Sequence, residues 1–125
     1  MQFINYGHQG DLNFKKIESL PSIQMDKIEE DKARGGITLA LGEHTNHAHV
    51  LVRDSEEVMV EALRAANGKQ YIRVSGGNAT LLHGTFISPA KIDERETDKH
   101  SSIVFTPGLY EQGYESEYDP FLQQI

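Results

Sequence analysis

Apolar and polar residues alternate with a period of two in many short stretches of this chain. Leu12 and Phe14 show this alternation near the start of the stretch 11–17, which we predict as the first strand. Successive side chains of a β-strand point to opposite faces of a sheet, so a period of two predicts half-buried strands. Further stretches that we predict as strands are 37–41, 47–53, 71–74, 79–83, 102–105 and 109–118, the last one broken at Gly113.

Two stretches fit more than one type of secondary structure. Residues 56–66 alternate like a strand, although residues 61–66 are good helix formers. The Asn67-Gly68 pair that follows favours a strand, because both residues tolerate the positive φ angles of a tight hairpin turn. Residues 22–36 carry few apolar side chains among many charges, so a short helix and an extended crossover both stay open there.

Turn residues separate the predicted strands at short intervals. Gly76-Gly77-Asn78 and Thr106-Pro107-Gly108 are two such turns. Many short strands divided in this way are typical of an all-β barrel or sandwich. The 125 residues suit one domain. We therefore predict an N-terminal arm at 1–10 and a single β domain at 11–125, with a long loop or insertion at 84–101.

Composition narrows the classes of partner and compartment. The chain has no cysteine, which excludes disulfides and thiolate metal ligands. Its net charge of -7 and its scattered lysines and arginines argue against nucleic-acid binding. No apolar run approaches the roughly 18 residues of a membrane span, and residues 1–6 lack a secretion signal. We expect a cytoplasmic protein with no membrane contact, and a protein partner, a homo-oligomer and a small-molecule ligand all stay open.

Histidines form the main candidate site. Three of the six histidines fall within residues 42–49. His47 and His49 are two residues apart, so a strand would present both imidazoles on one face. His83 ends a later predicted strand, and His100 precedes another. If these strands close into a small barrel, the four imidazoles could converge at its mouth or in its lumen on a divalent transition metal such as Zn, Fe, Mn, Ni or Cu.

Other residues give weaker signals. Glu43, close to the histidines, is a candidate acid–base residue. His8 and His44 are assigned to loops and left out of the site. Tyr110, Tyr114 and Tyr118 are four apart and would share one strand face, which more often covers a core than performs catalysis. The chain contains no nucleophile elbow and no phosphate-binding loop. The alternative to metal binding is that the histidines are polar strand residues on a solvated face, with local hydrogen bonds.

Several short motifs of the chain form a set. They are Gly10-Asp11-Leu12, Gly42-Glu43-x-Thr45-x-His47-Ala48-His49, Leu82-His83, Pro107-Gly108-x-Tyr110 and Glu117-Tyr118-Asp119-Pro120-Phe121. Together they resemble a small family of uncharacterised proteins in bacteria and their phages. The resemblance implies that His83 and His100 match a histidine pair of that family, with 84–97 as an insertion. It implies no reaction, and it adds virion association as an alternative location if the chain is phage-encoded.

The stretch around the histidines also faintly resembles a motif of the cupin barrels. Gly42 precedes His47-x-His49 one residue closer than in that motif, and Asp54 stands in place of its glutamate. Pro107-Gly108 resembles part of the second cupin motif, but no histidine follows it. This resemblance implies a cupin-like barrel and covers one of its two motifs imperfectly.

Two hypotheses follow from the sequence. The first is a small all-β protein whose histidines line a metal-capable site, which would activate water or dioxygen if the protein is an enzyme. The second is a non-enzymatic binding or structural module, associated with a phage or its host, whose histidines serve packing. Measuring bound metal separates the two.

Overall fold

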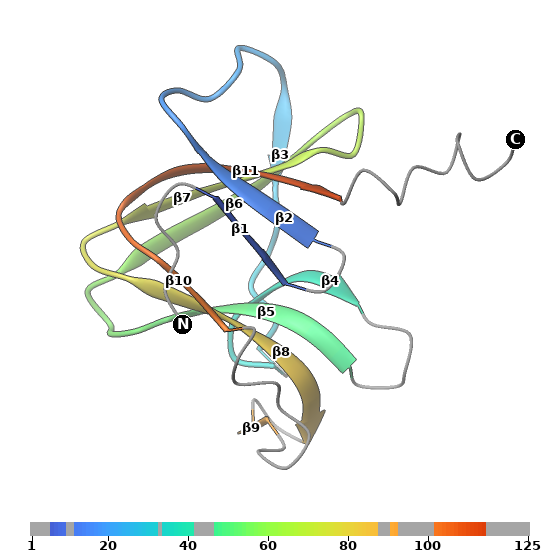
Figure 1. The fold of residues 1–125 in the computed structure, drawn as a ribbon, viewed down its shortest axis with the longest axis vertical. Helices are drawn as coiled ribbons and strands as arrows, with labels where there is room; N and C mark the ends of the chain where they lie inside the picture. The colour runs from blue at the N-terminus through green and yellow to red at the C-terminus, as the bar shows by residue number, and fades with distance from the viewer. Residues whose placement is uncertain are drawn as a thin grey trace, which may run out of the picture.

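Figure 1 shows the fold in a computed structural model, which describes residues 6–9, 12–32, 34–41, 47–87, 91–92 and 102–114. Every helix or strand assigned within these residues is a β-strand, and the strands form two antiparallel sheets. The predicted all-β class is therefore confirmed. Of the two predicted architectures, the chain adopts the small sandwich, and the sheets do not close into a barrel.

The first sheet has the strand order β1-β2-β11-β7-β6-β3, with antiparallel neighbours throughout. Its strands are β1 (Tyr6–Gln9), β2 (Leu12–Ile17), β3 (Met25–Lys27), β6 (Met59–Ala65), β7 (Gln70–Ser75) and β11 (Gly108–Tyr114). Tyr110, Ile72 and Ala62 are register partners across β11, β7 and β6, and all three are fully buried. They form one apolar row that faces the interior of the sandwich.

The second sheet has the strand order β10-β8-β5-β4, and β9 pairs with β8 beside this path. Its strands are β4 (Ile37–Leu41), β5 (His47–Arg53), β8 (Ala79–Ile87), β9 (Lys91–Ile92) and β10 (Ile103–Phe105). Ile37, Leu51, Leu81 and Ile103 are register partners across these four main strands and are buried. This row faces the row of the first sheet.

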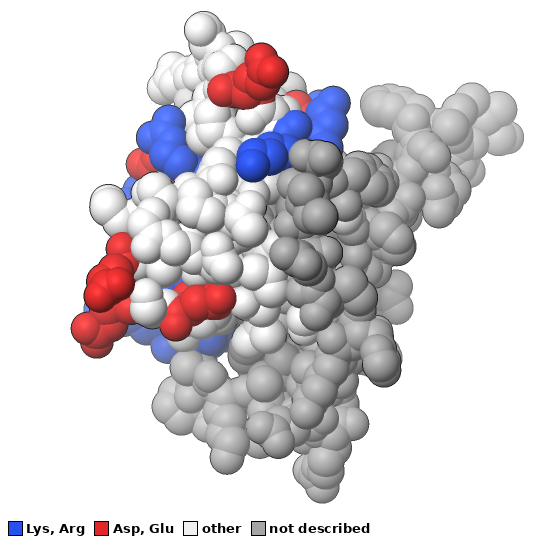
Figure 2. Space-filling model, turned by 60° about the vertical axis from the view of Figure 1, so that its left-hand side comes forward, with Lys and Arg blue, Asp and Glu red and all other residues white. Residues whose placement is uncertain are grey.

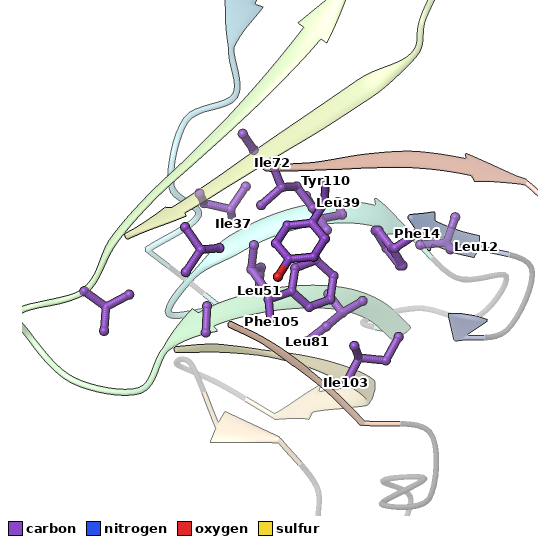
Figure 3. Close-up of a cluster of buried hydrophobic side chains, with 14 residues drawn as sticks. Leu12, Phe14, Ile37, Leu39, Leu51, Ile72, Leu81, Ile103, Phe105 and Tyr110 are labelled. Carbon is purple, nitrogen blue, oxygen red and sulfur yellow. The ribbon is translucent and has the colours of Figure 1, made fainter. Parts of the chain in front are cut away.

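Aromatic rings join the two sheets at the centre of the core (Figure 3). Phe105 of β10 lies with its ring centroid 5.1 Å from that of Phe14 on β2, in an edge-to-face arrangement. The same ring lies 4.9 Å from the ring of Tyr110 on β11. The Tyr110 hydroxyl donates a hydrogen bond of 2.6 Å to the Thr106 carbonyl, so its polar end is satisfied although its ring is buried.

Glycines set the geometry of two places where the backbone is tightly constrained. Gly68 has a φ of 88° in the β6–β7 turn, as the Asn-Gly signal predicts. Gly36 stands where β4 begins beside β5, and a Cβ there would collide with the Leu51 carbonyl oxygen. The absence of a side chain at Gly36 therefore lets the backbone of these segments approach closely.

Several segments differ from the sequence prediction. Residues 6–9 of the predicted arm form β1, which pairs with β2. The stretch 22–36 is an extended crossover that contains β3. The prediction of a long loop at 84–101 was wrong for its first residues, because β8 continues to Ile87. The end of β8 pairs with β9. Gly113 lies within β11 and does not interrupt it.

Charged side chains are spread over the described surface. Figure 2 shows them on one face in separate small groups of both signs, without a continuous basic patch there. This distribution agrees with the scattered cations of the sequence and with its net charge of -7. Within the described residues, no helix is long and apolar enough to cross a membrane.

Candidate functional site

The candidate site lies where β5 and β8 pair. His49 and His83 are direct register partners on these two strands, two positions beyond the buried pair of Leu51 and Leu81. Side chains two positions apart on a strand share a face. The histidine pair therefore continues the inward-facing side of the second sheet, beyond the apolar row that ends the main core.

Local alternation on β5 explains why His49 points inward. Ala48 and Val50 are fully buried and form a separate small cluster with Val52 and Leu82. Leu51, on the opposite face, belongs to the main core. Both faces of β5 are thus occupied by apolar residues, and His49, at 7% exposure, is a buried polar side chain among them. A buried polar group of this kind requires a hydrogen-bond partner.

Gln9 on β1 supplies that partner from the other sheet. Its Nε2 donates a hydrogen bond of 3.0 Å to the Leu81 carbonyl oxygen. Its Oε1 lies 2.7 Å from Nδ1 of His49. The side chain of Gln9 is fully buried, so one amide group spans the interior between β1, β8 and β5.

The direction of these two bonds fixes the protonation of the imidazole. A main-chain carbonyl can only accept, so the Gln9 amide nitrogen faces Leu81 and its oxygen faces His49. The oxygen can also only accept, so Nδ1 of His49 carries the proton. The lone pair of the neutral His49 ring therefore lies on Nε2, the nitrogen that commonly binds metals in proteins.

The rings of His49 and His83 are stacked. Their centroids are 4.0 Å apart and their planes differ by 8°. The lone pair of an imidazole nitrogen lies in the plane of its own ring, and two nearly parallel planes do not meet at one ion. One ring must therefore tilt out of the stack before both can bind the same metal.

The other predicted site residues are only partly covered by the structure. His47 lies on β5 two residues before His49, opposite Thr85 of β8, but its side chain is outside the described part. Glu43 and His100 fall outside the described residues altogether. Among the residues that are described, no group of three or more histidine, cysteine or acidic side chains is placed to hold a metal ion.

Sequence reasoning missed the contribution of Gln9. The residue lies in the stretch predicted as an arm, and a glutamine there has no periodic signal that marks it as buried. Its neighbours Gly7 and Gly10 favour a loop by composition. Only the pairing of β1 with β2 brings Gln9 into the interior.

Comparison with known proteins gives a family. Residues 8–114 match a family described as a domain of unknown function (DUF8820). The chain belongs to this family. No curated protein and no solved structure matches the chain. The DUF8820 match covers both sheets except for the first two residues of β1. It is consistent with the resemblance to an uncharacterised family, and it assigns no reaction and no ligand.

Proposed function

We propose that this DUF8820 domain binds a divalent transition metal ion through His49 and neighbouring histidines. The observation that carries the proposal is the hydrogen bond from His49 Nδ1 to the buried Gln9 oxygen. Histidines that ligate metals commonly donate their second ring nitrogen to a carbonyl or carboxylate, which orients the ring. His47, His83 and His100 are the candidate co-ligands, and Glu43 is the candidate acid–base residue.

The energy balance favours metal binding over the stack. A stacked aromatic pair contributes about 0.5–1.5 kcal/mol beyond its buried area. A structural zinc site contributes roughly 10–16 kcal/mol in small peptides at neutral pH. Tilting the ring of His83 away from His49 therefore costs little compared with the bonds that a metal would form. The proposal predicts that the stacked arrangement belongs to the metal-free protein.

The ligand chemistry selects among metals. Neutral imidazoles suit Zn, Cu, Fe and Ni, and they also occur with Mn, whereas Mg and Ca prefer oxygen ligands. A metal ion held by three histidines would keep one coordination position open. At that position the ion would bind and activate water or dioxygen. The domain contains no cysteine, so thiolate ligands do not contribute.

The direct test is the metal content of protein purified without a polyhistidine tag. We expect plasma mass spectrometry to find close to one ion per chain, or thermal stabilisation when Zn, Fe, Mn, Ni or Cu is added. The His49→Ala variant should lose this metal. The matched control is His8→Ala, which removes a histidine that lies outside the predicted site. A metal-free protein that none of these ions stabilises would contradict the proposal.

A structural role for the histidines is the second candidate, and the same network favours it. Gln9 already satisfies Nδ1 of His49 and the Leu81 carbonyl, so the pair can serve to join the two sheets without a metal. The domain would then be a binding or structural module, associated with a phage or its host. In that case His49→Ala would lower the free energy of unfolding equally with and without added metal.

A further inference from the structure

A pocket lies beside the β6–β7 turn and the end of β11. Its volume is about 440 Å³. It is lined by Asn67, Gly68, Lys69, Gln70, Gln112 and Gly113. None of these residues belongs to the histidine site, so the pocket is independent of the metal proposal.

A chain of hydrogen bonds fixes the side-chain amides at the base of this pocket. Arg64 donates two bonds to Oε1 of Gln70, of 2.9 Å from Nε and 2.7 Å from Nη2. Nε2 of Gln70 must then be the donor, and it bonds to the Leu39 carbonyl at 3.1 Å and to Oε1 of Gln112 at 2.9 Å. Since a guanidinium only donates, the orientation of both amides follows from Arg64.

This orientation leaves Nε2 of Gln112 as a donor that points to open space. Gln112 is only 4% exposed, and none of the described residues accepts a bond from its Nε2. Within the described part of the chain, no fully buried side-chain nitrogen or oxygen lacks a partner. This nitrogen must therefore reach accessible space, and the pocket is the space that Gln112 lines.

The rest of the lining also offers donors. Oδ1 of Asn67 accepts a bond of 2.9 Å from the Lys69 main-chain nitrogen, so the donor that Asn67 can offer to a ligand is Nδ2. The ammonium groups of Lys69 and Lys15 lie 3.5 and 3.8 Å from one carboxylate oxygen of Glu111. Lys69, a lining residue of the pocket, therefore shares its counter-ion with Lys15, and its ammonium is only partly neutralised.

We propose that this pocket binds a small ligand through a carboxylate group. The Gln112 amide and the Lys69 ammonium would each donate to it, and Gly68 leaves room, since a Cβ there would meet nothing within 4 Å. A planar, singly charged acceptor suits one amide and one partly neutralised ammonium. Phosphate carries more charge and is usually held by arginine forks or several main-chain donors, and no arginine is among the lining residues that the structure describes.

The test is a titration with N-acetylglycine, followed by ¹H–¹⁵N NMR. We expect saturable shifts of the Gln112 side-chain amide and of the Gly68 and Gly113 main-chain amides. The uncharged N-acetylglycinamide should bind at least about tenfold more weakly, because a charged acceptor forms the stronger hydrogen bonds. Tighter binding of inorganic phosphate than of N-acetylglycine would overturn the assignment to carboxylates.

Two variants and a control sharpen this titration. Gln112→Glu keeps an oxygen for Gln70 but replaces the donor with a negative charge, so binding should fall at least about tenfold. Lys69→Gln, on the exposed turn, should also weaken binding and does not depend on the core tolerating Gln112→Glu. Arg53→Gln removes a cation outside the pocket lining and should leave binding unchanged. Unchanged affinity in Lys69→Gln and in a folded Gln112→Glu would overturn the proposal.

Discussion

Gln9 joins the two sheets of the sandwich through a single amide group. Its nitrogen donates to the Leu81 carbonyl and its oxygen accepts from the His49 ring, and all three residues are buried. In such surroundings a lost hydrogen bond leaves a partner that water cannot reach. Gln9 therefore contributes to the stability of the fold and also fixes the orientation of the His49 ring.

Replacing Gln9 tests this role in the folded protein. Gln9→Leu leaves both the His49 Nδ1–H and the Leu81 carbonyl without their partner, so we expect the free energy of unfolding to fall by at least about 2 kcal/mol. Urea denaturation measures this change. In the double variant Gln9→Leu/His49→Leu the buried donor is gone as well, so the loss should be smaller than the sum of the two single losses. Additive losses would show that the two side chains do not interact.

Protonation of the histidines gives a second prediction at the scale of single residues. An imidazole must be neutral to bind a metal, and an unperturbed histidine takes up a second ring proton at about pH 6.5. We therefore expect metal affinity to be at least about tenfold lower at about pH 5.5 than at about pH 7.5. Calorimetric titration with Zn²⁺ at the two pH values measures it. An affinity that does not change with pH would point to carboxylate ligands instead.

At the scale of elements, local signals were sufficient for the hairpins and insufficient for the edges. The Asn67-Gly68 signal predicted the β6–β7 turn, and alternation predicted β2, β4 and β5. The short edge strands β1 and β3 have few apolar residues, and pairing with a neighbouring strand holds them in the sheet. β3 pairs with β6, which is distant in sequence, and β1 pairs with the adjacent β2 without the apolar alternation that marks a strand.

The same limit applies to the candidate site. Alternation predicted a strand at 47–53 that carries His49, and the structure adds that His83 lies directly beside His49. The stacking of the two rings and the partnership with Gln9 depend on strand register and on the packing of one sheet against the other. A short window of sequence encodes neither the strand register nor the packing of the sheets, so neither contact could be predicted.

Two turn glycines allow backbone strain to be separated from steric collision. Gly68 and Gly76 have similar φ angles of 88° and 79°, which L-residues adopt at a cost of about 1–2 kcal/mol. A Cβ on Gly68 would meet nothing within 4 Å, whereas a Cβ on Gly76 would lie 2.7 Å from the Glu57 carbonyl oxygen. We expect Gly68→Ala to lower the free energy of unfolding by that cost alone and Gly76→Ala by more. Equal losses in thermal or urea unfolding would contradict this account.

At the scale of the whole molecule, glutamine amides connect the sheets at two separate places. Gln9 of the first sheet reaches the Leu81 carbonyl, and Gln70 of the first sheet reaches the Leu39 carbonyl. Leu81 and Leu39 both belong to the second sheet. Phe14, Phe105 and the other residues of the core cluster fill the space between the two sheets (Figure 3). The sandwich thus combines an apolar centre with two directional polar links.

This arrangement predicts an order of opening in the native protein. The central strands β7 and β11 are paired on both sides and face the core, whereas β3 is a three-residue edge strand with no buried residue. Amide hydrogen exchange should therefore be slowest in β7 and β11 and fastest in β3. Exchange measured by NMR or mass spectrometry gives this order. Equal protection of β3 and β7 would mean that the sheet opens only as a whole.

The most direct test of the central claim is the ¹⁵N NMR spectrum of the His49 ring, recorded with and without Zn²⁺. The account predicts that the metal-free protein at neutral pH carries its proton on Nδ1, because Gln9 accepts it. It also predicts that Zn²⁺ shifts the Nε2 resonance and leaves Nδ1 protonated. A proton on Nε2 would contradict the network that Gln9 forms, and an Nε2 resonance unmoved by Zn²⁺ would contradict the metal site.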